Sequence, residues 1–384
     1  MIYLDSAATT AIRREVIEAM WPYLTGEFGN PSSHHPLGES AANALAAARS
    51  TVAKWLGCRA SEVIFTSGGT ESDNLAIKGM ALASPRGRHI ITTPIEHEAV
   101  LESCAYLERH HGFEVTMLSV DREGLVDPVE LESVIRADTT LVSVMYANNE
   151  VGTIQPIARI AEVARGAGAR MHSDAVQAAG ALPLDVSALG VDALSISGHK
   201  LGAPKGVGAL FLRGAVPIEA VLHGGGQERG RRSGTENVAG AVGLAAALVL
   251  GERVREADAA GLASIRDAFI DEVLATVPDA VLTGHRTQRL PGNASFCFPG
   301  TSGEAVLLQL EQHDIVCSSG SACAAGRDDP SHVLIAMGFE PAVAQTAVRF
   351  SFDATTTAEQ LHEVAESLRE AVLAVRAVGA ASRG

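Results

Sequence analysis

Aromatic residues and basic charge are both scarce in this chain of 384 residues. Only 4% of the residues are aromatic, so platforms on which nucleic-acid bases stack are not expected. Acidic side chains outnumber basic ones by 45 to 30, and the net charge of −15 repels phosphate backbones and anionic lipid. We therefore expect no nucleic acid and no membrane among the binding partners.

Cysteine is also rare, and the five cysteines contain no C-x-x-C pair: Cys58, Cys104, Cys297, Cys317 and Cys323. A disulfide framework and a zinc site are therefore not expected, and we predict no metal and a reducing, cytoplasmic location. The start of the chain has no signal-peptide pattern. The most apolar helical stretch, residues 237–254, ends in charged residues and predicts a buried helix, not a membrane span.

Short β-branched runs alternate with helix-length segments between residues 60 and 212. Such alternation predicts an α/β fold, with a mainly parallel seven-stranded sheet between helices in a large domain. The candidate strands, in one-letter code, are EVIFTS, RHIITTP, FEVTMLSV, TTLVSVMYA, ARMHSDAV, DALSISG and GALFLRG.

The length of the chain exceeds that of a single core and predicts two domains. A long helical stretch, from about Thr235 to Leu274, is followed by strands and helices that suit a smaller α+β domain. We expect residues 14–257 to form the large domain, and residues 1–13 and 258–384 to form the small one.

The stretch FTSGGTESDN predicts a site for an anion. A strand passes through Gly69 and Thr70 directly into a helix, where free N–H groups, glycine and a hydroxyl suit a phosphate. A tight turn before a capped helix fits the same residues. The stretch is neither a Walker loop nor a G-x-G-x-x-G motif.

Two further motifs end strands of the same predicted sheet. Asp174, followed by Gln177, lies in HSDAVQ, and Lys200 lies in SGHK after Ser197 and His199. Ligands bind at the carboxyl ends of such strands, although the aspartate also fits a helix N-cap and the lysine a surface loop. A phosphate seat, an aspartate that keeps a pyridinium nitrogen protonated and a lysine that forms a Schiff base are together what pyridoxal 5'-phosphate requires. We therefore predict this cofactor, carried by Lys200 in the large domain.

From end to end the chain resembles the NifS/IscS-like cysteine desulfurases, which belong to the class V aminotransferase family and to fold type I of the pyridoxal phosphate enzymes. The matching stretches follow the family's order along the chain: YLDSAATT, FGNPSSHHPLG, FTSGGTESDN, IEHEAVL, NNEVGTIQP, HSDAVQ, SISGHKLGAPKG, GGGQERGRRSGTEN, SSGSAC and PSHVL.

The resemblance implies a role for each candidate site residue. His97 stacks on the cofactor ring and takes part in catalysis, Asn149 and Gln177 lie near the ring's phenolic oxygen, and Arg349 with Asn149 binds the substrate carboxylate. The cofactor phosphate is held by Gly69, Thr70, Ser197 and His199, and by Thr235 of the neighbouring subunit in a homodimer. From the residues alone, His97 also fits a helix cap, Asn149 a turn, and Arg349 a surface position on an edge strand.

Cys323 lies among serine, glycine and alanine, which predicts an accessible segment of the small domain, whereas Cys317 ends an apolar run and reads as buried. The resemblance implies that Cys323 takes sulfur from L-cysteine, leaving L-alanine. The resulting persulfide is donated to an acceptor protein such as an iron–sulfur scaffold. The alternatives are a selenocysteine lyase, another fold-type I pyridoxal phosphate enzyme, or an inactive adaptor in sulfur trafficking.

Overall fold

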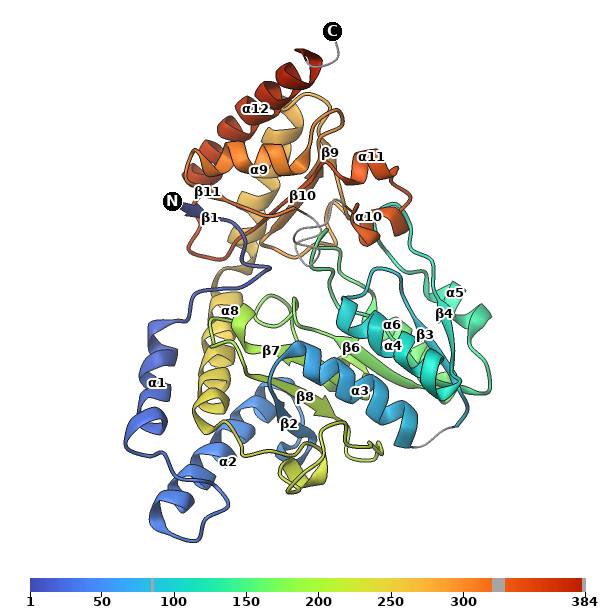
Figure 1. Cartoon of the computed structure of the whole chain (residues 1–384), viewed down its shortest axis with the longest axis vertical. Helices are drawn as coiled ribbons and strands as arrows, with labels where there is room; N and C mark the ends of the chain where they lie inside the picture. The colour runs from blue at the N-terminus through green and yellow to red at the C-terminus, as the bar shows by residue number, and fades with distance from the viewer. Residues whose placement is uncertain (84–85, 320–328, 382–384) are drawn as a thin grey trace.

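The structure is a computed structural model that describes residues 1–83, 86–319 and 329–381. Its main feature is a seven-stranded sheet with the strand order β2-β8-β7-β6-β5-β3-β4 (Figure 1). Neighbouring strands pair in parallel, except that β8 is antiparallel to both β7 and β2. The strands are β2 (Val63–Thr66), β3 (His89–Thr92), β4 (Glu114–Met117), β5 (Thr139–Ser143), β6 (Arg170–Asp174), β7 (Ala193–Ser197) and β8 (Gly208–Leu212). Each predicted run contains one of them, so the prediction of a mainly parallel seven-stranded sheet is confirmed.

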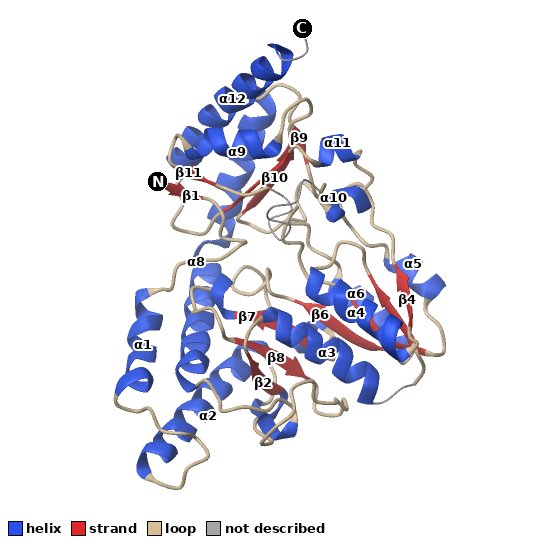
Figure 2. Ribbon diagram, viewed as in Figure 1, coloured by secondary structure: helices blue, strands red, loops and turns tan. Residues whose placement is uncertain are grey.

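Helices cover both faces of this sheet, which explains why its central strands are buried along their whole length (Figure 2). One face packs against α3 (Gly69–Ala83) and α4 (Glu98–His111). The opposite face packs against α1 (Arg14–Thr25), α2 (Pro36–Leu56), α6 (Ile157–Gly166) and the first part of α8 (Val238–Thr276). Two shorter helices, α5 (Pro128–Val134) and α7 (Val186–Leu189), connect strands at the edges of this layer.

The helix α8 joins two separate hydrophobic cores. Leu244 and Leu248 in its first half belong to the core beneath the large sheet, whereas Phe269 and Val273 in its second half belong to a core formed mainly by the C-terminal part. The predicted long helix is therefore confirmed. Within the described ranges, no helix combines the length and apolar character that crossing a bilayer requires.

The second core lies between a small antiparallel sheet and helices (Figure 1). The sheet has the order β12-β10-β9, and β1 pairs in parallel with β11 beside it. The elements of this part of the molecule are β1 (Ile2–Tyr3), β9 (Val281–Leu282), β10 (Asn293–Cys297), α9 (Gly303–Glu311), β11 (Ile315–Val316), α10 (His332–Ala336), α11 (Pro341–Ala344), β12 (Ala347–Ser351) and α12 (Ala358–Ala381). Of these, α10 and α11 pack in a separate, smaller apolar cluster.

The first residues of the chain connect the two cores. Leu4 is buried in the second core, and Ser6 donates its backbone N–H to the carbonyl of Ser351 over 2.9 Å. Further along, Thr10 donates its backbone N–H to the carbonyl of His199 over 2.9 Å. Residues 5–10, which we call the N-terminal strap, thus extend from β12 to the turn that carries Lys200.

Candidate active site

A cavity opens at the carboxyl ends of the parallel strands, where the sequence predicts the site. The side chains and backbone that line it come from the loops after β2, β3, β5, β6 and β7. Among them are all the predicted cofactor residues except Thr235: Gly69, Thr70, His97, Asn149, Asp174, Gln177, Ser197, His199 and Lys200. The structure therefore brings together residues that the sequence places on separate motifs.

The predicted phosphate seat lies where β2 passes into α3. The helix begins at Gly69, so the N–H groups of its first turn have no partner within the helix and point towards the cavity end. A Cβ atom on Gly69 would lie 2.7 Å from Cγ2 of Val176, closer than packing allows. Thr70 on the same turn is exposed, and Ser197 at the end of β7 is buried nearby. This arrangement presents backbone N–H groups and two hydroxyls to an anion.

His199 adds a neutral imidazole to this seat. Its Nδ1 lies 3.2 Å from the hydroxyl of Thr9 in the N-terminal strap. Burial, together with the charges of Lys200 and Lys205, lowers the pKa of His199 to about 4. The ring is therefore uncharged at neutral pH and can serve the phosphate as a hydrogen-bonding group, not as a cation.

Asp174 ends β6 next to Lys200, which follows β7, the adjacent strand of the sheet. Its Oδ1 accepts the backbone N–H of Val176 over 2.8 Å, so the residue caps a turn, as the alternative interpretation allows, and also lines the cavity. Burial raises the pKa of Asp174, and the charges of His97 and Lys200 oppose this rise. A buried carboxylate of this kind is well placed to pair with a protonated ring nitrogen.

His97 both caps a helix and faces the cavity. Its Nδ1 accepts the backbone N–H of Ala99 over 3.1 Å at the start of α4, which fixes the orientation of the ring. Burial lowers the pKa of His97, Lys200 lowers it further, and Asp174 raises it. The two interpretations of this residue from the sequence are therefore compatible.

A buried carboxyl group, Asp73, also lines the cavity, and the sequence motifs did not single it out. It lies 3.6 Å from Nε2 of His172, but burial lowers the pKa of that imidazole to about 3, so the pair is not ionic. Burial and the charge of Asp174 raise the pKa of Asp73 well above its usual range.

Arg349 connects the second core to the wall of the cavity. It lies on the edge strand β12, as expected, but its side chain is only 2% exposed, so a surface position is wrong. Its Nη1 donates to the carbonyl of Asn149 over 3.1 Å, and its Nη2 donates to Oδ1 of Asp5 over 2.7 Å. Ser318 pairs with the backbone of Arg349, and the strap pairs with β12 at Ser351, so this edge of the sheet is covered. The strap also accepts a hydrogen bond of 3.1 Å from Gln177, through the carbonyl of Ala7.

Arg349 contacts Asn149 of the cavity wall but is not itself among the residues that line the cavity. Thr235 is exposed in the segment before α8 and does not line the cavity of its own chain. Cys323 lies outside the described residues. The neighbouring Cys317 follows β11, and burial raises the pKa of its thiol to about 12, so this thiol stays protonated at neutral pH. Among the described residues, no three His, Cys, Asp or Glu side chains are grouped to hold a metal ion.

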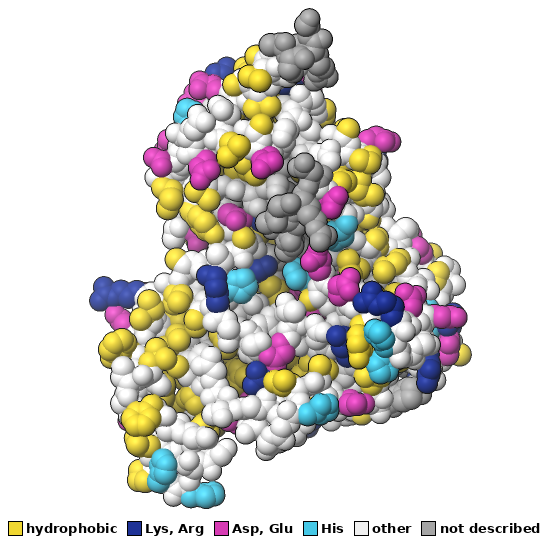
Figure 3. Space-filling view, in the orientation of Figure 1, with side chains coloured by type: hydrophobic (Ala, Val, Ile, Leu, Met, Phe, Trp, Pro, Cys, Tyr) yellow, Lys and Arg dark blue, Asp and Glu magenta, His cyan; other side chains and the backbone are white. Residues whose placement is uncertain are grey.

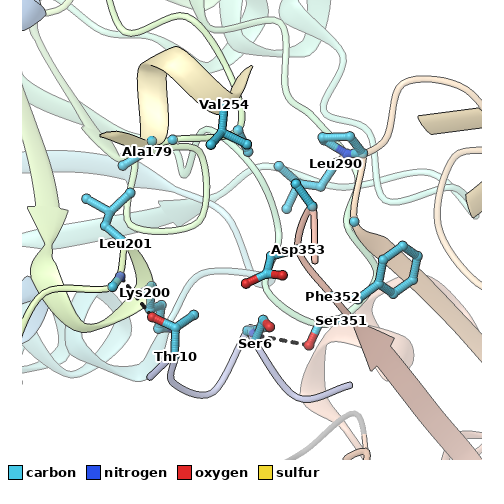
Figure 4. Close-up of a pocket in the computed structure, with 18 of the residues that line it drawn as sticks. Ser6, Thr10, Ala179, Lys200, Leu201, Val254, Leu290, Ser351, Phe352 and Asp353 are labelled. Atoms are coloured by element: carbon cyan, nitrogen blue, oxygen red, sulfur yellow. Dashed lines mark hydrogen bonds between the residues drawn. The ribbon is translucent and has the colours of Figure 1, made fainter. Parts of the chain in front are cut away.

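A second cavity of about 490 Å³ lies beside the first and shares Lys200 and Gln177 with it. Figure 4 shows Ser6 and Thr10 of the strap on one side of it and Val254 of α8 on another. Its walls come from both cores, and most of them are apolar.

The residues of the first cavity fit pyridoxal phosphate. A helix N-terminus and two hydroxyls suit its phosphate, a buried carboxylate suits its ring nitrogen, an oriented imidazole suits its ring, and a half-buried lysine suits its aldehyde.

Comparison with known proteins agrees with this geometry. The family "Aminotransferase class-V" matches residues 2–364. A cysteine desulfurase named IscS from Dictyoglomus turgidum is 47% identical over 98% of this chain and 96% of its own length. The solved structure of a NifS-like protein has a TM-score of 0.90 at 38% identity and covers 96% of this chain and 98% of its own. Another, described as SspA in complex with cysteine, has a TM-score of 0.80 at 35% identity, over 92% of this chain and 99% of its own. The chain thus belongs to the class V aminotransferase family, among the pyridoxal phosphate-dependent cysteine desulfurases of the IscS/NifS-like group.

Proposed function

We propose that this chain converts L-cysteine to L-alanine and keeps the sulfur as a persulfide on Cys323, from which an acceptor protein collects it. The observation that carries the proposal is that Lys200 and Asp174 end adjacent strands and line one cavity with the N-terminus of α3. That combination suits a phosphate-bearing pyridine aldehyde and an amino-acid substrate.

Each side chain of the site has its own role in the proposed reaction. Pyridoxal phosphate, when bound, supplies an electrophilic carbon for the substrate amine and a ring that accepts electrons. Asp174 keeps the ring nitrogen protonated, and Lys200 moves the proton at the substrate's Cα. His97 would stack on the ring, and Asn149 and Gln177 would hold its phenolic oxygen, since all three line the cavity. Arg349 binds the substrate carboxylate, since its guanidinium is fixed beside the cavity wall by Asn149.

The sulfur step balances without an added oxidant. The C–S bond of L-cysteine breaks while an S–S bond to Cys323 forms, and the thiol proton of Cys323 is balanced by the hydrogen that completes the methyl group of L-alanine. The high pKa of Cys317 supports Cys323 as the nucleophile, because a protonated thiol reacts poorly. The related structure named as a complex with cysteine supports L-cysteine as the substrate. The IscS name of the relatives supports an iron–sulfur scaffold as the acceptor.

A homodimer is part of the proposal. Thr235 is exposed on its own chain, as a residue that serves a neighbour's phosphate must be. Helix α1 and the loop after it also expose an apolar stripe at helical spacing, seen as yellow side chains at the lower left of Figure 3. The stripe comprises Ile17, Trp21, Leu24 and Phe28, exposed by 47–68%.

We also propose that the domains divide at residues 13/14 and 257/258, because the two cores meet along α8. A cytoplasmic location is supported by the four described cysteines, none of which is in a disulfide.

The test is direct. Purified protein should be yellow, and with L-cysteine and a reductant it should release sulfide and L-alanine in equal amounts. Assays with L-selenocysteine and with amino-group acceptors compare the competing activities. The proposal would be contradicted if the protein released no sulfide from L-cysteine, or if it turned over L-selenocysteine but not L-cysteine. Transfer of radiolabelled sulfur from the charged enzyme to an iron–sulfur scaffold tests the acceptor.

A further inference from the structure

Arg349 already has a negatively charged partner in the absence of substrate. The Oδ1 atom of Asp5 lies 2.7 Å from Nη2 of Arg349, in an ion pair whose arginine is 2% exposed and whose aspartate is 19% exposed. Asp5 comes from the N-terminal strap, at the opposite end of the chain from β12. Because water is largely excluded from the arginine, this charge is weakly screened.

The pair leaves one donor of the guanidinium unused. Among the described residues, Nε of Arg349 is buried and has no hydrogen-bond partner, while Nη1 and Nη2 are bonded to Asn149 and Asp5. An unsatisfied buried N–H group is costly, and a carboxylate oxygen would satisfy it. A carboxylate that reached this edge of the guanidinium would give the Nε–H group a partner.

The other titratable groups around Arg349 do not replace the charge of Asp5. Glu150 is buried next to the cavity wall, accepts a hydrogen bond from the hydroxyl of Ser331, and has its pKa raised by burial. Cys317 has a pKa of about 12, and the pKa of Tyr3 is raised by burial and by Asp5. Asp5 is thus the anion in direct contact with the guanidinium.

We propose that Asp5 is the resident counter-ion of Arg349, and that its charge weakens the hold of Arg349 on the carboxylate of the amino acid. The inference rests on the proposed function, since it takes Arg349 as the carboxylate-binding group. Two carboxylates on one guanidinium repel each other, so substrate binding and product release both become readily reversible. Asp5 is a positioning residue in this scheme, because it acts through Arg349.

The experiment measures ligand affinity in the holoenzyme. L-alanine and ethylamine differ by one carboxylate, and both can be titrated by the shift of the cofactor's visible band. In Asp5→Asn, which keeps an acceptor oxygen and removes the charge, L-alanine should bind roughly tenfold more tightly. Ethylamine should bind within about twofold of its affinity for the unchanged protein. Inhibition of turnover by L-alanine should strengthen in parallel.

Thermal unfolding provides a second readout. Loss of Asp5 leaves a buried charge unpaired, so the Tm of Asp5→Asn should fall, and saturating L-alanine should raise it by more than it raises the Tm of the unchanged protein. Asp267→Asn is the matched control, because Asp267 pairs at 2.8 Å with Arg266, whose side chain is 4% exposed. That variant should lose stability without any change in L-alanine affinity.

Further variants separate this inference from the proposed function. If Arg349→Ala leaves L-alanine affinity unchanged, the carboxylate role of Arg349 is wrong and the inference falls with it. The other outcome is that Arg349→Ala lowers the affinity for L-alanine, whereas Asp5→Asn leaves that affinity unchanged or lowers it. In that case only the inference is overturned. If Asp5→Asn increased the affinity for ethylamine as much as that for L-alanine, the inference would also be overturned, because the effect would not act through the carboxylate. Should Asp5→Asn not fold, Asp5→Ser carries the same expectations.

Discussion

The carboxylate of Glu228 and the guanidinium of Arg49, 179 positions apart, form two hydrogen bonds of 2.6 and 2.7 Å. Glu228 also accepts the backbone N–H of Phe65 over 3.3 Å and is almost fully buried. Both Glu228 and Arg229 have positive φ angles, 48° and 61°, which are uncommon for residues other than glycine. The ion pair holds this unusual backbone in place and so fixes the segment that carries Thr235.

Thr235 is predicted to act on the phosphate site of a neighbouring subunit. Thr235→Ala should bind pyridoxal phosphate less tightly, whereas a mixed dimer of Thr235→Ala and Lys200→Ala subunits should contain one intact site. In that dimer, the subunit with the intact lysine receives the threonine from its partner. Mixed dimers, separated by two affinity tags, should therefore regain about half of the activity at low cofactor concentration. If they regain none, Thr235 acts within its own chain, and if Thr235→Ala alone binds the cofactor as tightly as the unchanged protein, Thr235 has no role at the phosphate.

Lys200 is predicted to carry the cofactor. Lys200→Ala should lose the visible band and all turnover but keep its fold, because a half-buried lysine in a short turn contributes little to the core. Absorbance, far-ultraviolet circular dichroism and sulfide release measure the three properties. Lys205→Ala, an exposed lysine of the same turn, should retain both the band and the activity. Desulfurase activity in Lys200→Ala would refute the assignment.

The two neighbouring cysteines are predicted to differ in chemistry. After treatment with L-cysteine, mass spectrometry of the digested protein should find the added sulfur on Cys323. Cys323→Ala should still bind L-cysteine and shift the visible band, yet form neither L-alanine nor persulfide in a single turnover. Cys317→Ala should remain active and lose roughly a kcal/mol of stability, typical of a modest truncation in a core. Added sulfur on Cys317 would contradict this prediction.

Glu62 is predicted to stabilise the fold in a pH-dependent way. Its carboxylate accepts hydrogen bonds of 2.8–2.9 Å from two groups of Arg59 and from the backbone N–H of Gly214. The pKa of Glu62 is lowered from 4.5 to about 2, and the main cause is the hydrogen bond from the Arg59 side chain. The carboxylate therefore stabilises the folded state above pH 4.5, and this contribution is lost as the pH falls towards 2.

Glu62→Gln should consequently lower the free energy of unfolding by about 1–2 kcal/mol at pH 7, as measured with urea. The difference from the unchanged protein should shrink between pH 4.5 and pH 2. Glu18→Gln is the control, because the pair of Glu18 with Arg14 is exposed and contributes little. A difference that stays constant down to pH 2 would mean that packing, not charge, is responsible.

The sequence was sufficient for the large sheet and for most of the candidate site. Most of the strands lie in β-branched or apolar runs, Asp174 ends one strand and Lys200 follows the next, so their meeting at one edge could be predicted. Asp73 carries a weaker signal, since it lies one helical turn after Gly69 and Thr70, and that spacing places it on their face of α3. The rise in its pKa could not be predicted, because it depends on burial beside Asp174.

The partner of Arg349 could not be predicted either. A local pattern shows that the arginine lies on a strand, but its ion pair is with Asp5, which is 344 positions away. The sequence contains no periodicity that links the strap to β12. Contacts of this length are decided by packing of the whole chain, not by any window of residues.

The pairing of β1 with β11, and of Asp5 with β12, also limits when these contacts can form during synthesis of the chain. The first residues to be synthesised must wait for partners that are among the last to emerge. A nascent chain therefore contains its lysine turn long before Arg349 has been synthesised. The ion pair between Asp5 and Arg349 is in this way postponed until translation is nearly complete.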